Sequence, residues 1–171
     1  MKRAIAVSIF VLVLLVAVGF FVTRAEAETV KYKITSYLTK VEMIPVPDVE
    51  NHFIGAQERR GVAIFENGET AAYHMWCTLE FISGQGGSYK GYSILSFVDG
   101  STSMIKFEGT QTGEKLWSGK GTAEYIKGTG RFEGIKGNVT YTNKLLTPYT
   151  KDETKGDQIV EATATYTLPK K

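Results

Sequence analysis

The sequence predicts an all-β protein: a single antiparallel β-barrel of about eight strands behind an N-terminal export signal. Three observations favour this fold class. Apolar and polar residues alternate with a period of two from residue 29 to the end, glycine-containing turns separate the alternating stretches, and no convincing amphipathic helix follows the signal. A barrel is preferred to an open sheet because closure leaves no unpaired edge on so small a sheet.

Residues 1–27 have the features of a signal peptide. Lys2 and Arg3 precede an apolar run from Ala4 to Val22, and Ala25-Glu26-Ala27 supplies a small-x-small cleavage pattern. We therefore expect residues 28–171 to form one mature barrel domain that is exported, either periplasmic or secreted. The alternative is an uncleaved membrane anchor, because the apolar run approaches the roughly 20 residues that span a bilayer.

Composition limits the expected partners of the mature domain. Removing Lys2, Arg3, Arg24 and Glu26 from totals of 20 basic and 18 acidic residues leaves 17 of each. Because basic residues form no stripe, we expect neither nucleic acid nor an anionic membrane surface as a partner. Cys77 is the only cysteine, so no intramolecular disulfide is possible, and we expect a buried, inert thiol.

The first half of the domain predicts three strands. In the first strand one face is apolar, and residues 44–52 are expected to form a loop because Pro45 and Pro47 lack the amide donor of a central strand. A second strand is expected at 53–65, broken or bulged near Glu58–Gly61. Asn67-Gly68 then joins it through a tight hairpin to a third strand at 70–82. The apolar face of the first strand carries Val30, Tyr32, Ile34 and Leu38.

The second half predicts five more strands. Asp99-Gly100 joins two of them in a hairpin, and Gly128-Thr129-Gly130 turns the chain between the next two. These strands are expected at 89–98, 102–108, 117–125, 135–145 and 160–168, with loops at 84–87, 110–116 and 147–157.

A segment near the second of these turns resembles a known family. Residues 125–137, YIKGTGRFEGIKG, are similar to the glycine-rich hairpin G-[ST]-G-x-F-x-G-x-x-G of the allene oxide cyclase and dirigent-like barrels. The resemblance is clearest over residues 89–141. It implies an eight-stranded barrel with an apolar central cavity, often assembled as a trimer. The catalytic acidic positions of these families are not matched in this chain, so the resemblance concerns the fold.

Within this segment Gly128 and Gly130 are expected to allow positive φ, and Phe132 to plug one end of the barrel.

Inward-facing aromatic residues with small residues between them predict an interior ligand site. The candidate ligand-binding residues are Tyr73, Trp117, Gly121, Tyr125 and Tyr166. The expected function is binding of a small hydrophobic molecule; if the protein is an enzyme, cofactor-free cyclisation or isomerisation is the expected chemistry. The alternative is a non-enzymatic structural or interaction protein with a packed barrel. A cavity of a few hundred Å³ favours the first hypothesis.

His74 and Glu80 are the candidates for general acid or base catalysis. They share one face of strand 70–82 with Trp76 and Thr78, and they would need to face a dry interior to act this way. We expect this face to point outward, as a wet surface or an oligomer contact, because the opposite row is more uniformly apolar. Since His74 and Cys77 point to opposite faces, we expect no metal site, and no motif indicates a cofactor.

Overall fold

The computed structural model describes residues 26–82, 84–112, 117–147 and 156–170. Their strands are β1 (Glu28–Pro45), β2 (His52–Phe65), β3 (Thr70–Ile82), β4 (Gly86–Phe97), β5 (Thr102–Thr112), β6 (Ser118–Thr129), β7 (Lys136–Leu145) and β8 (Gln158–Thr167). A single 3₁₀ turn, η1 (Gly130–Phe132), stands between β6 and β7 in the described chain. The predicted signal peptide falls almost wholly on residues 1–25, which lie outside the described residues.

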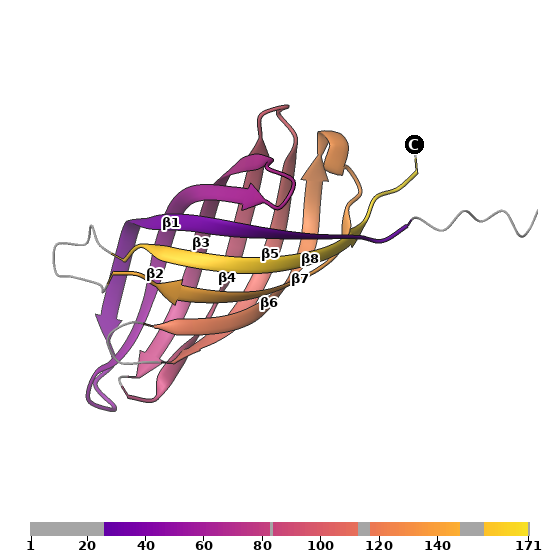
Figure 1. Ribbon diagram of the computed structural model, residues 1–171. Helices are drawn as coiled ribbons and strands as arrows, with labels where there is room; N and C mark the ends of the chain where they lie inside the picture. Colours follow the sequence, from indigo (N-terminus) through magenta and orange to yellow (C-terminus); the bar gives the residue numbers. More distant parts are fainter. Residues whose placement is uncertain (1–25, 83, 113–116, 148–155, 171) are drawn as a thin grey trace, which may run out of the picture.

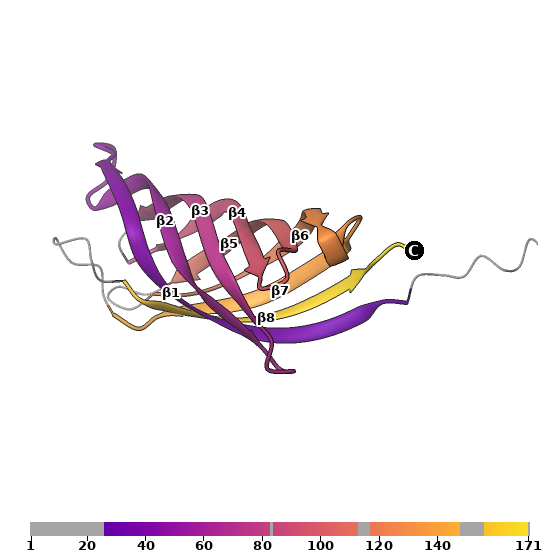
Figure 2. The ribbon, with the colours of Figure 1, turned by 90° about the horizontal axis from the view of Figure 1, so that it is seen from above.

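The eight strands form a closed antiparallel barrel, as predicted (Figure 1). Each strand pairs with the next in sequence, and the first nine residues of β1 close the barrel by pairing with β8, from Glu28 opposite Tyr166 to Ser36 opposite Gln158. Figure 2 shows β1 and β2 curving across the barrel. Closure satisfies the backbone donors and acceptors that an open edge would leave unpaired. No helix within the described residues is long and apolar enough to cross a membrane.

Alternation along each strand sends one row of side chains into the barrel and the other to the surface. The burial pattern of β3 alternates through all its residues, and the predicted inward row of β1 is buried at Tyr32, Ile34 and Leu38. Burying a row of this kind is the main source of stability for a small domain without disulfides. The inward row of β3 consists of Ala71, Tyr73, Met75, Cys77, Leu79 and Phe81.

Both predicted hairpins are confirmed. Gly68 and Gly100 have φ of 84° and 80°, in the left-handed region that tight hairpin turns require and that glycine adopts without strain. The expectation for Gly128 was wrong, because its φ is not positive. A side chain there would instead collide with the carbonyl of Phe132, so close backbone approach requires the glycine.

Three predicted boundaries differ from the structure. β1 continues to Pro45 because only β2 pairs with it beyond Ser36, so the missing proline amide faces no strand on the other side. The predicted bulge lies in β1, where Thr39 is skipped between the Leu38–Arg59 and Lys40–Glu58 pairs, and not in β2. Pairing also extends the strands into predicted loops, starting β4 at Gly86 and ending β5 at Thr112.

Candidate functional site: a tyrosine-lined cavity inside the barrel

A small cavity lies in the middle of the barrel. Its volume is about 60 Å³, and its wall comes from seven strands, with side chains of the inward rows of every strand except β2. The wall is mainly apolar, and none of the described residues that line it carries a charge. The lining residues are Tyr32, Ile34, Tyr73, Met75, Tyr89, Ser93, Leu95, Ser103, Ile105, Phe107, Tyr125, Val139, Tyr141, Asn143, Gln158, Val160 and Ala162.

Several buried polar groups of this wall have no hydrogen-bond partner among the described residues. Tyr32 and Tyr73 are 5% and 8% exposed, and Ser93 and Ser103 are both 4% exposed, yet their hydroxyls make no hydrogen bond to any described residue. The Gln158 side chain is equally without a described partner. Among described side chains, Ser36 Oγ is the only fully enclosed polar atom left unbonded, so these other groups reach the open space of the cavity. Buried polar groups are nearly always bonded, so a cluster of exceptions requires an explanation.

Other hydroxyls of the same wall are satisfied. Tyr89 donates to Asn143 Oδ1 at 3.1 Å, and Tyr141 donates to the Glu108 carbonyl at 3.0 Å. Each of these rings also covers a glycine directly opposite it on the neighbouring strand, Gly109 for Tyr89 and Gly121 for Tyr141. These two tyrosines therefore act as part of the wall.

Burial keeps the phenols neutral. It raises the pKa of Tyr32, Tyr73 and Tyr125 well above the usual range, since a phenolate would lose its hydration there. All three line the same cavity, and Tyr125 and Tyr73 raise the pKa of Tyr32 further. At neutral pH each hydroxyl is therefore protonated and able to donate a hydrogen bond.

A buried cation lies close to the cavity. Arg59 is 1% exposed; its Nε donates to Gln57 Oε1 at 3.2 Å, and its Nη1 donates to the carbonyl of Gly156. The Gln57 amide in turn donates to Cys77 Sγ at 3.1 Å. Cys77 is buried as expected, and desolvation raises the pKa of its thiol. Arg59 lowers the pKa of Tyr73 against the larger effect of burial, so its positive charge is felt at the cavity wall.

Two of the five predicted ligand-binding residues, Tyr73 and Tyr125, line the cavity. The other three lie elsewhere. Trp117 packs on Phe81, with ring centroids 4.3 Å apart, and Gly121 is covered by the Tyr141 ring. Tyr166 stacks edge-on against Tyr125, and its hydroxyl donates to the Glu28 carboxylate at 3.0 Å. Burial, followed by that hydrogen bond, raises the pKa of Tyr166 to about 12.

The candidate acid–base residues His74 and Glu80 lie on the outer face of β3, as expected for that row. His74 Nε2 is 2.6 Å from Glu58 Oε1, and its ring stacks on Trp76 at 3.8 Å. Glu80 Oε1 is 3.1 Å from Nε2 of His52. Neither residue reaches the interior cavity, so the condition of a dry pocket is not met for either.

Sequence reasoning missed two sets of residues. Ser93 and Ser103 fall on the same alternation as Leu95 and Phe107, so their inward position was available from the pattern. His52 was assigned to a loop, but it is 7% exposed and lies between two carboxylates, with Nδ1 2.7 Å from Asp48 Oδ1. Only the β2–β3 pairing brings Glu80 to its other nitrogen, and no sequence signal reports that contact.

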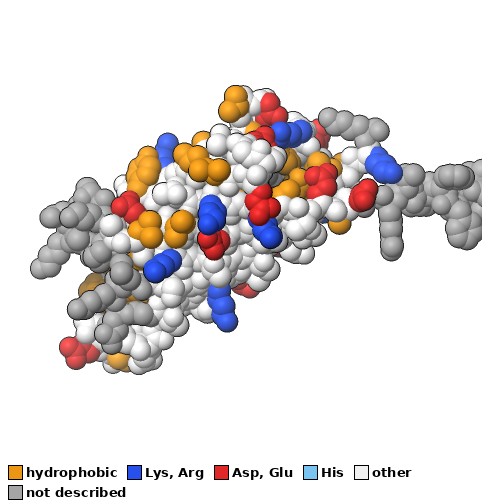
Figure 3. All heavy atoms as spheres, viewed as in Figure 1, with side chains coloured by type: hydrophobic (Ala, Val, Ile, Leu, Met, Phe, Trp, Pro, Cys, Tyr) orange, Lys and Arg blue, Asp and Glu red, His pale blue; other side chains and the backbone are white. Residues whose placement is uncertain are grey.

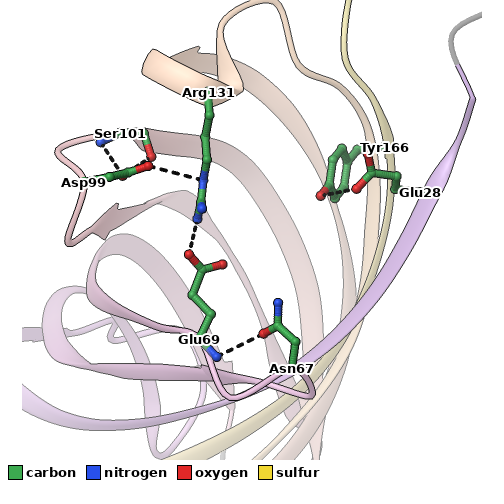
Figure 4. Close-up of polar contacts among 7 residues, drawn as sticks. All are labelled: Glu28, Asn67, Glu69, Asp99, Ser101, Arg131 and Tyr166. Carbon is green, nitrogen blue, oxygen red and sulfur yellow. Dashed lines mark hydrogen bonds and ion pairs between the residues drawn. The ribbon is translucent and has the colours of Figure 1, made fainter.

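One end of the barrel, here called the capped end, is closed by η1 and the β2–β3 and β4–β5 hairpins. Phe132 is buried there, as predicted, with its ring 4.8 Å from Phe97. Arg131 lies over both rings, and its guanidinium points between Glu69 and Asp99, one from each hairpin (Figure 4). This single side chain thus connects three separate turns across the aromatic plug.

The outer face carries mixed charge and a few exposed aromatics. On the side seen in Figure 3, acidic and basic side chains lie interspersed. Trp76 and Tyr92 are 41% and 44% exposed and stand directly opposite each other on β3 and β4. Within the described residues, no group of three or more His, Cys, Asp or Glu side chains is placed to hold a metal ion.

No protein-family model and no curated protein matches the chain. Two similar solved structures are the pterocarpan synthase dirigent proteins GePTS1 and PsPTS1. GePTS1 is 17% identical, with a TM-score of 0.46 over 85% of this chain and 93% of its own. PsPTS1 is 16% identical, with a TM-score of 0.49 over 85% and 97%. At these values the likeness says nothing about activity, and the barrel rests on the strand pairing of this chain itself.

Proposed function

We propose that this protein is a binding barrel whose interior cavity takes up a small, mainly apolar molecule. The observation that supports this is the cluster of buried hydroxyls, on Tyr32, Tyr73, Ser93 and Ser103, that have no bond to a described residue. Each such group costs about 1–3 kcal/mol when it is left unsatisfied. A barrel shaped only for stability would carry apolar side chains at these positions, so the hydroxyls are best explained by a molecule that bonds them.

The cavity sets the size of this molecule. At about 60 Å³ it is smaller than the few hundred Å³ expected for a binding barrel, and smaller than the roughly 150 Å³ that accommodates benzene elsewhere. The proposed ligand therefore has about four non-hydrogen atoms, unless lining rings rotate to admit a larger one. A four-atom ligand is limited to about −6 kcal/mol, which corresponds to a Kd of tens of micromolar at best.

Binding is proposed here in preference to catalysis. The described wall of the cavity holds no carboxylate or histidine, and its phenols keep their protons, so it offers donors but no general base. Cyclisation or isomerisation driven by shape alone stays a prediction.

We also propose that the domain acts after export and cleavage. In support, β1 begins at Glu28, directly behind the predicted cleavage site, so cleavage would leave all eight strands intact.

A fragment titration followed by NMR tests the binding proposal. Neutral molecules of four to seven non-hydrogen atoms should shift the methyl resonances of Val139, Val160 and Ala162, which line the cavity, and leave those of Val62 on the outer face unchanged. Ala162→Val places two more carbons in the cavity and should weaken binding at least tenfold. If no fragment shifts the cavity methyls, the interior is simply a packed core, and the alternative of a structural barrel replaces this proposal.

Exposed aromatics favour a second function, self-association through the outer face of β3 and β4. Trp76 and Tyr92 form a cross-strand aromatic pair at the surface, and water is a poor environment for such a pair. Light scattering should show an oligomer that the double variant Trp76→Ala, Tyr92→Ala dissociates. Ile126→Ala, at a similarly exposed apolar position on β6, is the control. A monomeric wild-type protein at micromolar concentration would end this proposal.

A further inference from the structure

We infer that the molecule held in the cavity is neutral and presents a hydrogen-bond acceptor, such as a carbonyl oxygen, to the hydroxyl of Tyr73. This inference rests on the proposed binding function and adds the chemical class of the ligand. It follows from three properties of the wall: which polar groups are unbonded, what they can donate, and where charge lies.

The unbonded groups call for an acceptor. Tyr32, Tyr73, Ser93 and Ser103 each hold one O–H proton, and none of these protons has an acceptor among the described residues. Asn143 Oδ1, an acceptor on the same wall, already accepts from Tyr89. A hydrocarbon would leave every one of these donors unsatisfied, whereas a single carbonyl oxygen has two lone pairs and can accept from two of them.

Charge excludes an ionised ligand. The described wall has no charged side chain, and an ion moved into such a space loses far more hydration energy than a few neutral hydroxyls return. An ammonium group is further disfavoured, because Arg59, which pairs with Met75 beside Tyr73, places positive charge close to that tyrosine.

The same charge gives the ligand an orientation. Arg59 is held in place by Gln57 and the Gly156 carbonyl. It pairs with Met75, the inward neighbour of Tyr73 on β3, so its positive charge lies near that tyrosine, and it lowers the pKa of Tyr73. An electron-rich oxygen is therefore best placed at Tyr73, with the apolar remainder of the molecule toward Val139, Val160 and Ala162.

A matched pair of probes tests this inference. Acetone and isobutene have nearly the same shape and four non-hydrogen atoms each, but only acetone has an acceptor. Methyl NMR titration gives the Kd of each probe. Isobutene leaves water more readily than acetone, so each binding free energy is first corrected for the probe's transfer free energy from water. After this correction acetone should bind at least fivefold more tightly than isobutene. In Tyr73→Phe acetone should bind about fivefold more weakly, with isobutene unchanged or tighter, which is the effect of one lost hydrogen bond of about 1 kcal/mol.

Tyr141→Phe is the control, because Tyr141 lines the same cavity while its hydroxyl already donates to Glu108. It should leave the ratio between the two probes unchanged. If Tyr73→Phe weakens both probes equally, or neither, the acceptor inference is overturned while binding itself stands. If neither probe shifts the cavity methyls of the wild-type protein, both the acceptor inference and the proposed binding function fail.

Discussion

The two ends of the barrel interior are built from different chemistry. At the capped end, Phe65, Phe97 and Phe132 pack ring against ring, with centroids 5.7 and 4.8 Å apart, and Arg131 covers Phe97 and Phe132. Toward the other end, here called the Arg59 end, the Phe81 and Trp117 rings pack together, but the inward rows also hold buried Arg59, Gln111, Asn143 and Gln158. The tyrosine-lined cavity lies between the two.

This difference separates stability from function. Aromatic packing at the capped end has no directional demand beyond shape, so related apolar residues can replace one another there. Polar groups at the Arg59 end are restricted by hydrogen-bond geometry, and burying them stabilises the fold only while each is bonded. A protein that needed only a stable barrel would use the first chemistry at both ends, so the polar end points to a use for the interior.

Replacing the buried cation should have the largest effect. Arg59→Met keeps a long side chain but removes the donors to Gln57 and Gly156. We expect the free energy of unfolding to fall by about 3–5 kcal/mol, because the partners stay buried without their charge-assisted bonds. Urea denaturation measures this loss. A change below about 1 kcal/mol would show that the Arg59 end tolerates apolar residues as the capped end does.

The aromatic plug should respond differently to apolar substitution. Phe132→Ala should lower the free energy of unfolding by about 3 kcal/mol through lost burial and a new cavity, whereas Phe132→Leu should lose only about 1 kcal/mol. Urea denaturation of both variants provides the comparison. Equal losses would mean that the plug depends on a specific aromatic geometry, which contradicts the contrast drawn between the two ends.

The cation over the plug should contribute less. Arg131 is 40% exposed in its side chain, so its ion pairs with Glu69 and Asp99 are partly screened by water. Arg131→Ala should lower the free energy of unfolding by about 1 kcal/mol. Because 1 M salt screens the ion pairs of Arg131, the wild-type protein should lose part of the same stabilisation at that salt concentration. Thermal unfolding at low and high salt measures both quantities. A loss as large as that for Phe132→Ala would make Arg131 the main support of the capped end.

A small pH-dependent effect is expected at the β1–β2 turn. The hydrogen bond to Asp48 is the main cause that raises the pKa of His52, so the stability it adds is complete below the unfolded pKa of about 6.5. That stability is lost as pH rises through the higher folded pKa. The pKa of Asp48 is lowered by the same bond, so its contribution is lost toward acid. His52→Gln should therefore lower Tm more at pH 5 than at pH 9. An identical Tm difference between wild type and His52→Gln at both pH values would contradict a stabilising bond between His52 and Asp48.

Sequence patterns predicted the fold better than the site. Alternation and the turns at Gly68 and Gly100 are local, so eight strands and their inward rows could be derived from the sequence. The site depends on register, which is set between strands distant in sequence. Tyr141 covers Gly121 only because β6 and β7 pair those two residues. The Tyr141 ring therefore occupies the space beside Gly121 in which a ligand was expected.

The central claim is that the Tyr73 hydroxyl is kept for a ligand and contributes nothing to the stability of the empty barrel. The most direct test compares the free energy of unfolding of Tyr73→Phe and Tyr89→Phe, two inward tyrosines of the same cavity wall. Tyr89→Phe removes the bond to Asn143 and should lower the free energy of unfolding by about 1 kcal/mol. Tyr73→Phe should leave it unchanged or raise it. An equal loss for both would show that the Tyr73 hydroxyl already has a partner within the protein, and the claim would be wrong.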